Sequence, residues 1–175
     1  VTLLCRKMAD EISHTVFLSL GSNLEDRIGA IGRAYEEIEK RIGKIISRSA
    51  FYLSEPEGFE SENSFVNSVC KVVTDLLPYK LLEETRQIEK ELGRCGKSID
   101  GRYADRIIDI DMLMYDSRII EDQLLTVPHP RFHLRGFVLV PFAEISPDTV
   151  HPVQGKTILV LRNELREPTG VHPIR

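Results

Sequence analysis

The sequence contains no tryptophan and only three cysteines among 175 residues, namely Cys5, Cys70 and Cys95. An odd number of cysteines without Cys-x-x-Cys spacing supports neither a disulfide framework nor a zinc site, so we expect a reducing, cytoplasmic setting. Long apolar runs are also missing. The longest, Val16–Leu20 and Phe137–Phe142, are far shorter than the roughly 20 residues of a membrane-spanning helix, which excludes a membrane protein.

Neither charge sign dominates the composition. The 23 Lys and Arg residues against 27 Asp and Glu residues give a net charge of −4 at pH 7, so no overall field favours a polyanion. We therefore expect no nucleic-acid partner and no membrane partner.

The chain length is one domain's worth, and no repeat or Pro/Gly/Ser-rich linker divides it. We predict a single monomeric domain over residues 8–165. Residues 1–7 precede a stretch at Met8 that has the form of a natural start, so we interpret them as upstream or expression-derived sequence. Residues 166–175 hold few apolar groups and are predicted to form a loose tail.

Apolar patterning predicts six main elements. Apolar residues spaced by three and four predict helices over 24–42 and 78–92, the second beginning with Pro78. β-branched and apolar runs predict strands over 15–20, 45–54, 64–74 and 106–115. The order strand-helix-strand-strand-helix-strand is that of an α+β, ferredoxin-like α/β sandwich with an antiparallel sheet. After residue 124 we expect a loop, a short apolar segment and a C-terminal extension.

The strongest chemical signal is the segment Arg106-Ile107-Ile108-Asp109-Ile110-Asp111. Residues two apart in a strand share a face about 7 Å apart, so the carboxylates of Asp109 and Asp111 can converge on one small volume. The neighbouring side chains are apolar, and two carboxylates are costly to bury among them without a cation. Oxygen ligands favour Mg²⁺, which takes its other ligands from water and phosphates. The alternative is a solvated strand end with two surface aspartates.

Basic residues flank this strand in the sequence: Arg94, Lys97, Arg102 and Arg106 precede it, and Arg131 and Arg135 follow it. Arginine binds phosphate oxygens bidentately, and a glycine-containing loop can fold over a triphosphate, whereas a solvated charged face is the alternative. Gly96-Lys97-Ser98 resembles the end of a P-loop. However, the position five residues before Gly96 is Glu91, and the segment follows a helix instead of beginning one, so the sequence contains no P-loop.

Three further side chains also have ordinary structural explanations. His129 lies between two prolines, which fix the backbone and can present the imidazole to a ligand, but a lone histidine in a rigid turn is more often structural. Phe65 and Asn67 share a predicted strand face and combine a stacking ring with a side-chain amide. Core packing is the alternative for this pair.

Taken together, these segments resemble the 6-hydroxymethyl-7,8-dihydropterin pyrophosphokinase family of folate biosynthesis, over about residues 14–160. The resemblance is carried by an ordered set of motifs with matching gaps: Leu20-Gly21-Ser22-Asn23-Leu24, Phe51-Tyr52, Ser54-Glu55-Pro56, Phe65-Val66-Asn67, Glu89 with Leu92-Gly93-Arg94, the aspartate segment, and Val127-Pro128-His129-Pro130-Arg131 with Arg135-Gly136-Phe137.

The resemblance implies transfer of the β,γ-diphosphate of ATP to the hydroxymethyl oxygen of the pterin, with release of AMP. It further implies that Asp109 and Asp111 hold two Mg²⁺ ions and that Arg94 and Arg106 are catalytic. By the same resemblance, ATP contacts Glu89, Lys97, Met112, Thr126, His129 and Arg135, and the pterin contacts Ser54, Glu55, Phe65, Asn67, Tyr103 and Phe137. Glu57 departs from the family pattern, in which a bulky apolar residue usually packs on the pterin.

Two other classes of protein stay open at this point. The ferredoxin-like fold hosts many functions, so one alternative is a non-catalytic module that binds RNA or a small regulator. The absence of an RNA-recognition aromatic signature and the acidic net charge disfavour it. A ligand-binding or aldolase-like partner in pterin metabolism would account for Phe65 and Asn67, but not for the aspartate pair and the arginines.

Overall fold

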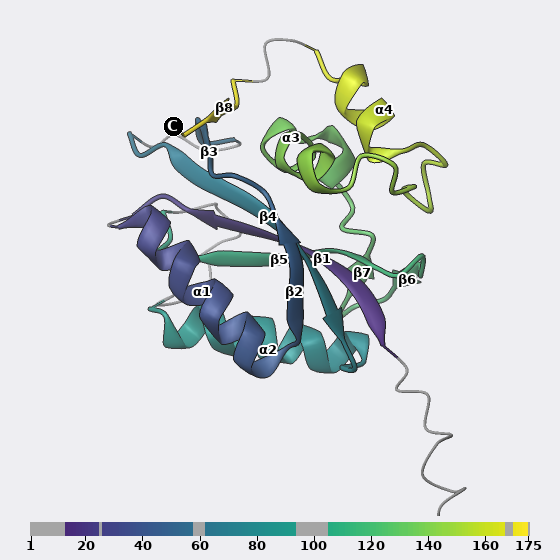
Figure 1. Cartoon of the computed structure of the whole chain (residues 1–175), viewed down its shortest axis with the longest axis horizontal. Helices are drawn as coiled ribbons and strands as arrows, with labels where there is room; N and C mark the ends of the chain where they lie inside the picture. Colours follow the sequence, from purple (N-terminus) through teal and green to yellow (C-terminus); the bar gives the residue numbers. More distant parts are fainter. Residues whose placement is uncertain (1–12, 25, 58–61, 94–104, 167–169, 175) are drawn as a thin grey trace, which may run out of the picture.

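An antiparallel sheet forms the centre of the molecule (Figure 1). The computed structural model describes residues 13–24, 26–57, 62–93, 105–166 and 170–174. Strand β1 (His14–Ser22) is central and pairs with β4 (Phe65–Thr74) on one side and with β5 (Asp109–Tyr115) on the other. All three strands are largely buried, which fits their β-branched and apolar sequences.

The outer edge of β4 is shared by two short strands. β2 (Lys44–Arg48) pairs with the second half of β4, and β3 (Tyr52–Ser54) pairs with its first half. The sequence predicted one continuous strand over 45–54, and this prediction is wrong at residues 49–51. The backbone leaves the ladder there because Ser49 Oγ accepts a hydrogen bond from Val69 N at 3.0 Å, a contact between distant segments.

Two helices cover one face of the sheet (Figure 1). α1 (Arg27–Arg41) begins after Asp26, whose side chain accepts from Gly29 N, and α2 (Pro78–Glu91) begins with proline at its first position. Both helices place their apolar stripe on the sheet, as the spacing of three and four predicted. The predicted bounds differ from the observed ones by no more than three residues at any end.

The opposite face is covered by chain beyond the ferredoxin-like core. α3 (Gly136–Ile145), α4 (Ile158–Glu164) and the 3₁₀ turn η2 (Phe132–Leu134) pack there against Phe17, Val69 and Leu113. The apolar segment after residue 124 is therefore a helix, α3, although Pro141 lies inside it. This helix has no amphipathic period that would identify it from the sequence, because most of its residues are apolar.

The sheet order and the two-layer core confirm the predicted α+β ferredoxin-like fold, with the strands arranged β5-β1-β4 followed by β2 and β3. A separate hairpin joins β6 (Ile120–Glu121) to β7 (Thr126–Val127). Within the tail that was predicted to be loose, β8 (His172–Pro173) pairs with β3. Among the described residues, no helix is long and apolar enough to cross a membrane.

Candidate active site

Strand β5 places two carboxylates side by side on one face of the sheet. Asp109 lies opposite Gly21 of β1, and Asp111 lies opposite Ser19. The intervening Ile110 and the following Met112 are buried in the cluster on the α1 and α2 side. The shared face that the two-residue spacing predicted is therefore confirmed, while the predicted strand start at residue 106 is wrong, because β5 begins at Asp109.

Arg106 precedes the strand, and Asn23 holds both of its backbone polar groups. Asn23 Oδ1 accepts from Arg106 N at 2.8 Å, and Asn23 N donates to Arg106 O at 3.2 Å. These two bonds draw residue 106 out of the strand ladder and direct its side chain to Asp109. The Arg106 Nη1 to Asp109 Oδ2 distance is 2.6 Å, and both side chains are mostly buried. The guanidinium is thus already next to the carboxylate pair.

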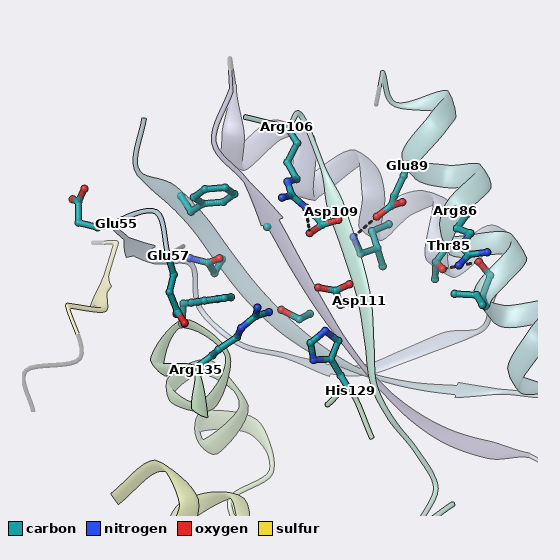
Figure 2. Close-up of a pocket in the computed structure, with 17 residues that line it drawn as sticks. Glu55, Glu57, Thr85, Arg86, Glu89, Arg106, Asp109, Asp111, His129 and Arg135 are labelled. Carbon is teal, nitrogen blue, oxygen red and sulfur yellow. Dashed lines mark hydrogen bonds and ion pairs between the residues drawn. The ribbon is translucent and has the colours of Figure 1, made fainter. Parts of the chain in front are cut away.

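Glu89 of α2 braces the strand between the two aspartates. Its Oε1 accepts from Ile110 N at 2.7 Å, and only 6% of the residue is exposed. Ile110 belongs to the outer strand of the sheet, so this carboxylate occupies a backbone donor that no neighbouring strand takes. Figure 2 shows Glu89 reaching from its helix toward the strand beside Asp109 and Asp111.

His129 and Arg135 approach from the chain between β7 and α3. His129 N donates to Leu113 O at 2.9 Å, which ties this segment to the end of β5. Burial is the main cause that lowers the His129 pKa to about 4, and the positive charges of Arg135 and Arg131 add to it, whereas Asp109 opposes them. The imidazole is therefore neutral at pH 7, which leaves one nitrogen to donate and one to accept.

The site has an aromatic and amide end, formed by Phe65, Asn67 and Phe137, beside the carboxylates. Asn67 of β4 is directly opposite Gly21, so the row Asp109, Gly21, Asn67 crosses three strands. Asn67 Nδ2 donates to Ser54 Oγ at 2.9 Å in a buried pair. A Cβ built on Gly21 would lie 3.4 Å from Asn67 Oδ1 and 3.7 Å from Phe65. Glycine at this position leaves open the floor between the amide and the aspartates.

These groups line one cavity of about 300 Å³, a volume in the range of small-molecule sites. Ten predicted site residues line it: Glu55, Phe65, Asn67, Glu89, Arg106, Asp109, Asp111, His129, Arg135 and Phe137. Figure 2 shows Asp109, Asp111, His129 and Arg135 around a common space, with Glu57 also in the lining and Glu55 at the rim.

Other predicted residues lie elsewhere. Ser54 is buried behind Asn67, the Met112 side chain belongs to the core, and Thr126 is in β7, so none of the three lines the cavity. Arg94, Lys97 and Tyr103 lie outside the described residues.

Sequence reasoning did not identify six lining residues as part of the site: Ser19, Gly21, Leu82, Thr85, Arg86 and Ile110. Four of them had a usable signal. Leu82, Thr85 and Arg86 precede Glu89 by seven, four and three residues, which places them on the same helix face. Ile110 lies between the two aspartates, but its apolar side chain and the alternation of the strand indicated the opposite face.

The donor set fits a hard divalent cation. Asp109 and Asp111 offer only oxygen atoms as ligands. Among the described residues, no cluster of three or more His, Cys, Asp or Glu side chains could hold an ion without further ligands. Two carboxylates with an open side are what Mg²⁺ uses when nucleotide phosphates and water complete its octahedron. The described lining also carries three arginines, Arg86, Arg106 and Arg135, which suit the phosphates.

Comparison with known proteins identifies the family. The sequence profile of the family described as 7,8-dihydro-6-hydroxymethylpterin-pyrophosphokinase (HPPK) matches residues 17–147. A 2-amino-4-hydroxy-6-hydroxymethyldihydropteridine pyrophosphokinase of Aquifex aeolicus is 40% identical over 86% of this chain and 91% of its own length. The protein of the same name in Porphyromonas gingivalis is 42% identical over 78% of this chain and 93% of its own length.

Longer relatives are similar to this chain over only part of their length. Folic acid synthesis protein fol1 of Pneumocystis carinii is 45% identical over 83% of this chain, which spans 19% of the fungal protein. The crystal structure of Plasmodium falciparum HPPK-DHPS wild type with pteroate superposes with a TM-score of 0.72, covering 87% of this chain and 44% of that one. At 17% identity, that likeness shows the fold alone. By its profile match and its bacterial relatives, the chain belongs to the 7,8-dihydro-6-hydroxymethylpterin-pyrophosphokinase family, ATP-dependent diphosphotransferases of folate synthesis.

Proposed function

We propose that this chain transfers the β,γ-diphosphate of ATP to the hydroxymethyl oxygen of 6-hydroxymethyl-7,8-dihydropterin and releases AMP. The observation that carries the proposal is the arrangement of a single cavity, in which the Asp109 and Asp111 pair lies between an aromatic and amide end and an α2 end. In the reaction, the pterin oxygen bonds to the β-phosphorus, the bond from that phosphorus to the α-phosphate oxygen breaks, and the hydroxyl proton is lost.

The pterin occupies the aromatic end in this proposal. Phe65 and Phe137 contact the two faces of its ring, and Asn67 hydrogen-bonds to its polar edge. Ser54 acts behind Asn67, since its hydroxyl fixes the amide at 2.9 Å. Glu55 at the rim, and Tyr103 outside the described residues, are the further pterin contacts.

The nucleotide occupies the α2 end. Leu82, Thr85 and Ile110 offer a partly apolar surface for the base, with Arg86 and Glu89 beside it. His129 and Arg135 are placed to contact phosphate oxygens, together with Lys97 outside the described residues. Met112 can contribute only backbone groups, because its side chain is buried in the core. We retain Thr126 of β7 as an ATP contact in the proposal.

Two Mg²⁺ ions on Asp109 and Asp111 would neutralise the triphosphate and polarise the β-phosphorus. The chain's own part is to hold the carboxylates on one strand face and to keep Arg106 at 2.6 Å from Asp109. Arg106 and Arg94, the two catalytic arginines of this proposal, would balance charge as the diphosphate moves. The aromatic end orients the attacking oxygen, since positioning is most of the work in such a transfer.

The decisive assay follows the nucleotide product. ATP, Mg²⁺ and 6-hydroxymethyl-7,8-dihydropterin should give pterin-dependent AMP. ADP would indicate simple phosphoryl transfer, and an absence of turnover would favour a binding module.

Asp109→Ala and Asp111→Ala should each lower turnover by at least about 1,000-fold, because charge stabilisation of this kind supplies several kcal/mol to the transition state. Circular dichroism should show an unchanged fold. Asp148→Ala, at an exposed loop position, is the matched control and should keep full activity. Wild-type turnover in either site variant would contradict the assignment of the metal ligands.

We also propose that the chain binds two Mg²⁺ ions, is a monomer and works in the cytoplasm. A reducing compartment is supported by the buried, unpaired Cys70, the one cysteine within the described residues. Analytical ultracentrifugation at micromolar concentration measures the molecular mass in solution and so tests the monomeric state. Titration with Mn²⁺ in the presence of a non-hydrolysable ATP analogue measures the number of ions bound.

A further inference from the structure

The two walls of the aromatic end belong to different layers of the fold. Phe65 and Asn67 lie on β4, whereas Phe137 lies in the first turn of α3, and all three line the cavity. The separation of these walls therefore depends on how firmly α3 is fixed to the sheet edge. A flat ring inserted between two phenyl rings is sensitive to that separation, because dispersion contacts weaken within about 1 Å of extra gap.

Glu144 connects α3 to this edge. Its carboxylate accepts from the Tyr52 hydroxyl at 2.9 Å, and both of its oxygens lie 3.1 Å from Ala50 N. Glu144 follows Phe137 by seven residues, close to two helical turns, so the two side chains leave the same side of α3. The last turn of α3 thus adds polar contacts with the sheet edge to the buried apolar packing that holds this helix on the sheet.

Tyr52 belongs to the segment that holds the amide wall. It lies opposite Asn67 in the β3 and β4 pairing, two residues before the Ser54 that accepts from Asn67 Nδ2. Ala50 lies in the break between β2 and β3, where its N–H is not used by the ladder. Because β3 is only three residues long, contacts from outside the ladder contribute much of what fixes it.

The hydroxyl of Tyr52 remains a donor across the physiological range. Burial first, and the Glu144 carboxylate second, raise the Tyr52 pKa to about 12, whereas the charge of Arg162 acts in the opposite direction. A hydrogen bond from a neutral hydroxyl to a carboxylate is stronger than one between two neutral groups. Glu144 is itself at the surface, so solvent reduces this advantage and we expect an effect of moderate size.

We propose that Glu144, through Tyr52 and Ala50, is a positioning residue that sets the spacing of the aromatic end and so determines affinity for the pterin. The inference rests on the proposed function, since it takes the pterin to lie between Phe65 and Phe137. Glu144 does not line the cavity, so it acts on the substrate only through the elements that it joins.

The test separates pterin affinity from nucleotide affinity. Glu144→Ala should raise KM for the pterin about five-fold to ten-fold, the equivalent of one lost charged hydrogen bond, and leave KM for Mg·ATP within two-fold. Tyr52→Phe removes only the hydroxyl and should have a smaller effect of the same kind. Glu144→Gln retains an acceptor and should recover part of the affinity. The double variant Tyr52→Phe, Glu144→Ala should be no worse than Glu144→Ala alone, because both changes remove the same bond.

Glu164→Ala is the matched control, because Glu164 is an exposed glutamate of α4 that pairs with Lys156 away from the cavity. It should leave both KM values unchanged. Wild-type protein without pterin-dependent AMP formation would contradict the proposed function itself. If the wild type is active, unchanged pterin KM in the Glu144 variants, or equal rises in both KM values with a lowered melting temperature, would overturn the positioning role.

Discussion

At the scale of single residues, the site depends on polar side chains that fix the backbone around the carboxylate pair. Asn23 holds both backbone groups of Arg106, and Glu89 holds the N–H of Ile110 between the aspartates. Each of these hydrogen bonds satisfies a backbone N–H or C=O group that would otherwise lack a partner in the strand pairing. The carboxylate pair is consequently held in place before any ligand binds, which lowers the cost of assembling a charged site.

Glu57 is one of the positions at which this sequence departs from the pattern that its family resemblance implies. It lines the cavity, at a position where the resemblance implies a bulky apolar residue (Figure 2). We predict that Glu57→Leu tightens pterin binding about five-fold, because roughly 1 kcal/mol is gained when part of a leucine packs on the ring. Fluorescence titration of the pterin with a non-hydrolysable ATP analogue measures the change.

The control for this prediction is Glu62→Leu, which introduces the same side chain at an exposed position outside the cavity. It should leave pterin affinity unchanged. Equal affinity of Glu57→Leu and the wild type would show that the side chain at position 57 turns away from the bound pterin.

At the scale of elements, β8 is the least expected part of the site's support. It covers the outer edge of β3 opposite Tyr52 and Leu53, and Ile174 N donates to Phe51 O at 2.9 Å. It also lies outside residues 17–147, the part of the chain that matches the family profile. β3 is therefore held between β4 and a segment outside the residues that match the profile.

We predict that ending the chain after residue 170 lowers the melting temperature by about 2–6 °C. A few exposed backbone hydrogen bonds are lost, worth roughly 1–1.5 kcal/mol together in a chain of this size. Differential scanning calorimetry checks the change. Ala substitution at His172 should have no such effect, since its side chain is exposed and the backbone pairing remains. An unaltered melting temperature in the truncated chain would mean that the tail is loose, as the sequence alone suggested.

The sequence was sufficient where local pattern decides the structure. The alternation around Asp109 and Asp111 and the spacing of three and four in α1 and α2 are properties of the segments themselves. It failed where distant residues decide. The break after β2 depends on Ser49 reaching Val69, and the start of β5 depends on Asn23 holding Arg106. α3 was missed because an almost wholly apolar segment with an internal proline has no period to detect.

At the scale of the whole molecule, the half-buried His129 and the buried His151 link stability to pH. Burial is the main cause that lowers the pKa of both His129 and His151 to about 4, compared with about 6.5 in an unfolded chain. His151 Nδ1 accepts from Val153 N and Gln154 N at 3.2 and 3.3 Å, so a proton on this nitrogen would remove both bonds. The nearby His133 also disfavours the charged form of His151.

The sign follows from which state binds more protons. Between pH 6.5 and pH 4 these histidines are charged in the unfolded chain and neutral in the folded one, so acid favours unfolding. The free energy of unfolding should therefore be greatest above pH 6.5 and fall by up to roughly 2 kcal/mol per histidine between pH 7 and pH 5. Below pH 4 the folded state binds the same protons, and this contribution stops growing.

Urea titrations at pH 7, 6 and 5 measure this dependence, and two variants isolate its source. His151→Gln lowers stability at every pH but should flatten the decline between pH 7 and pH 5, because one of the two titrating groups is gone. His172→Gln changes an exposed histidine of β8 and should reproduce the wild-type slope. If His151→Gln also kept the wild-type slope, the pH dependence would come from other groups. Replacement of a buried neutral imidazole should remove its share of the proton uptake on unfolding.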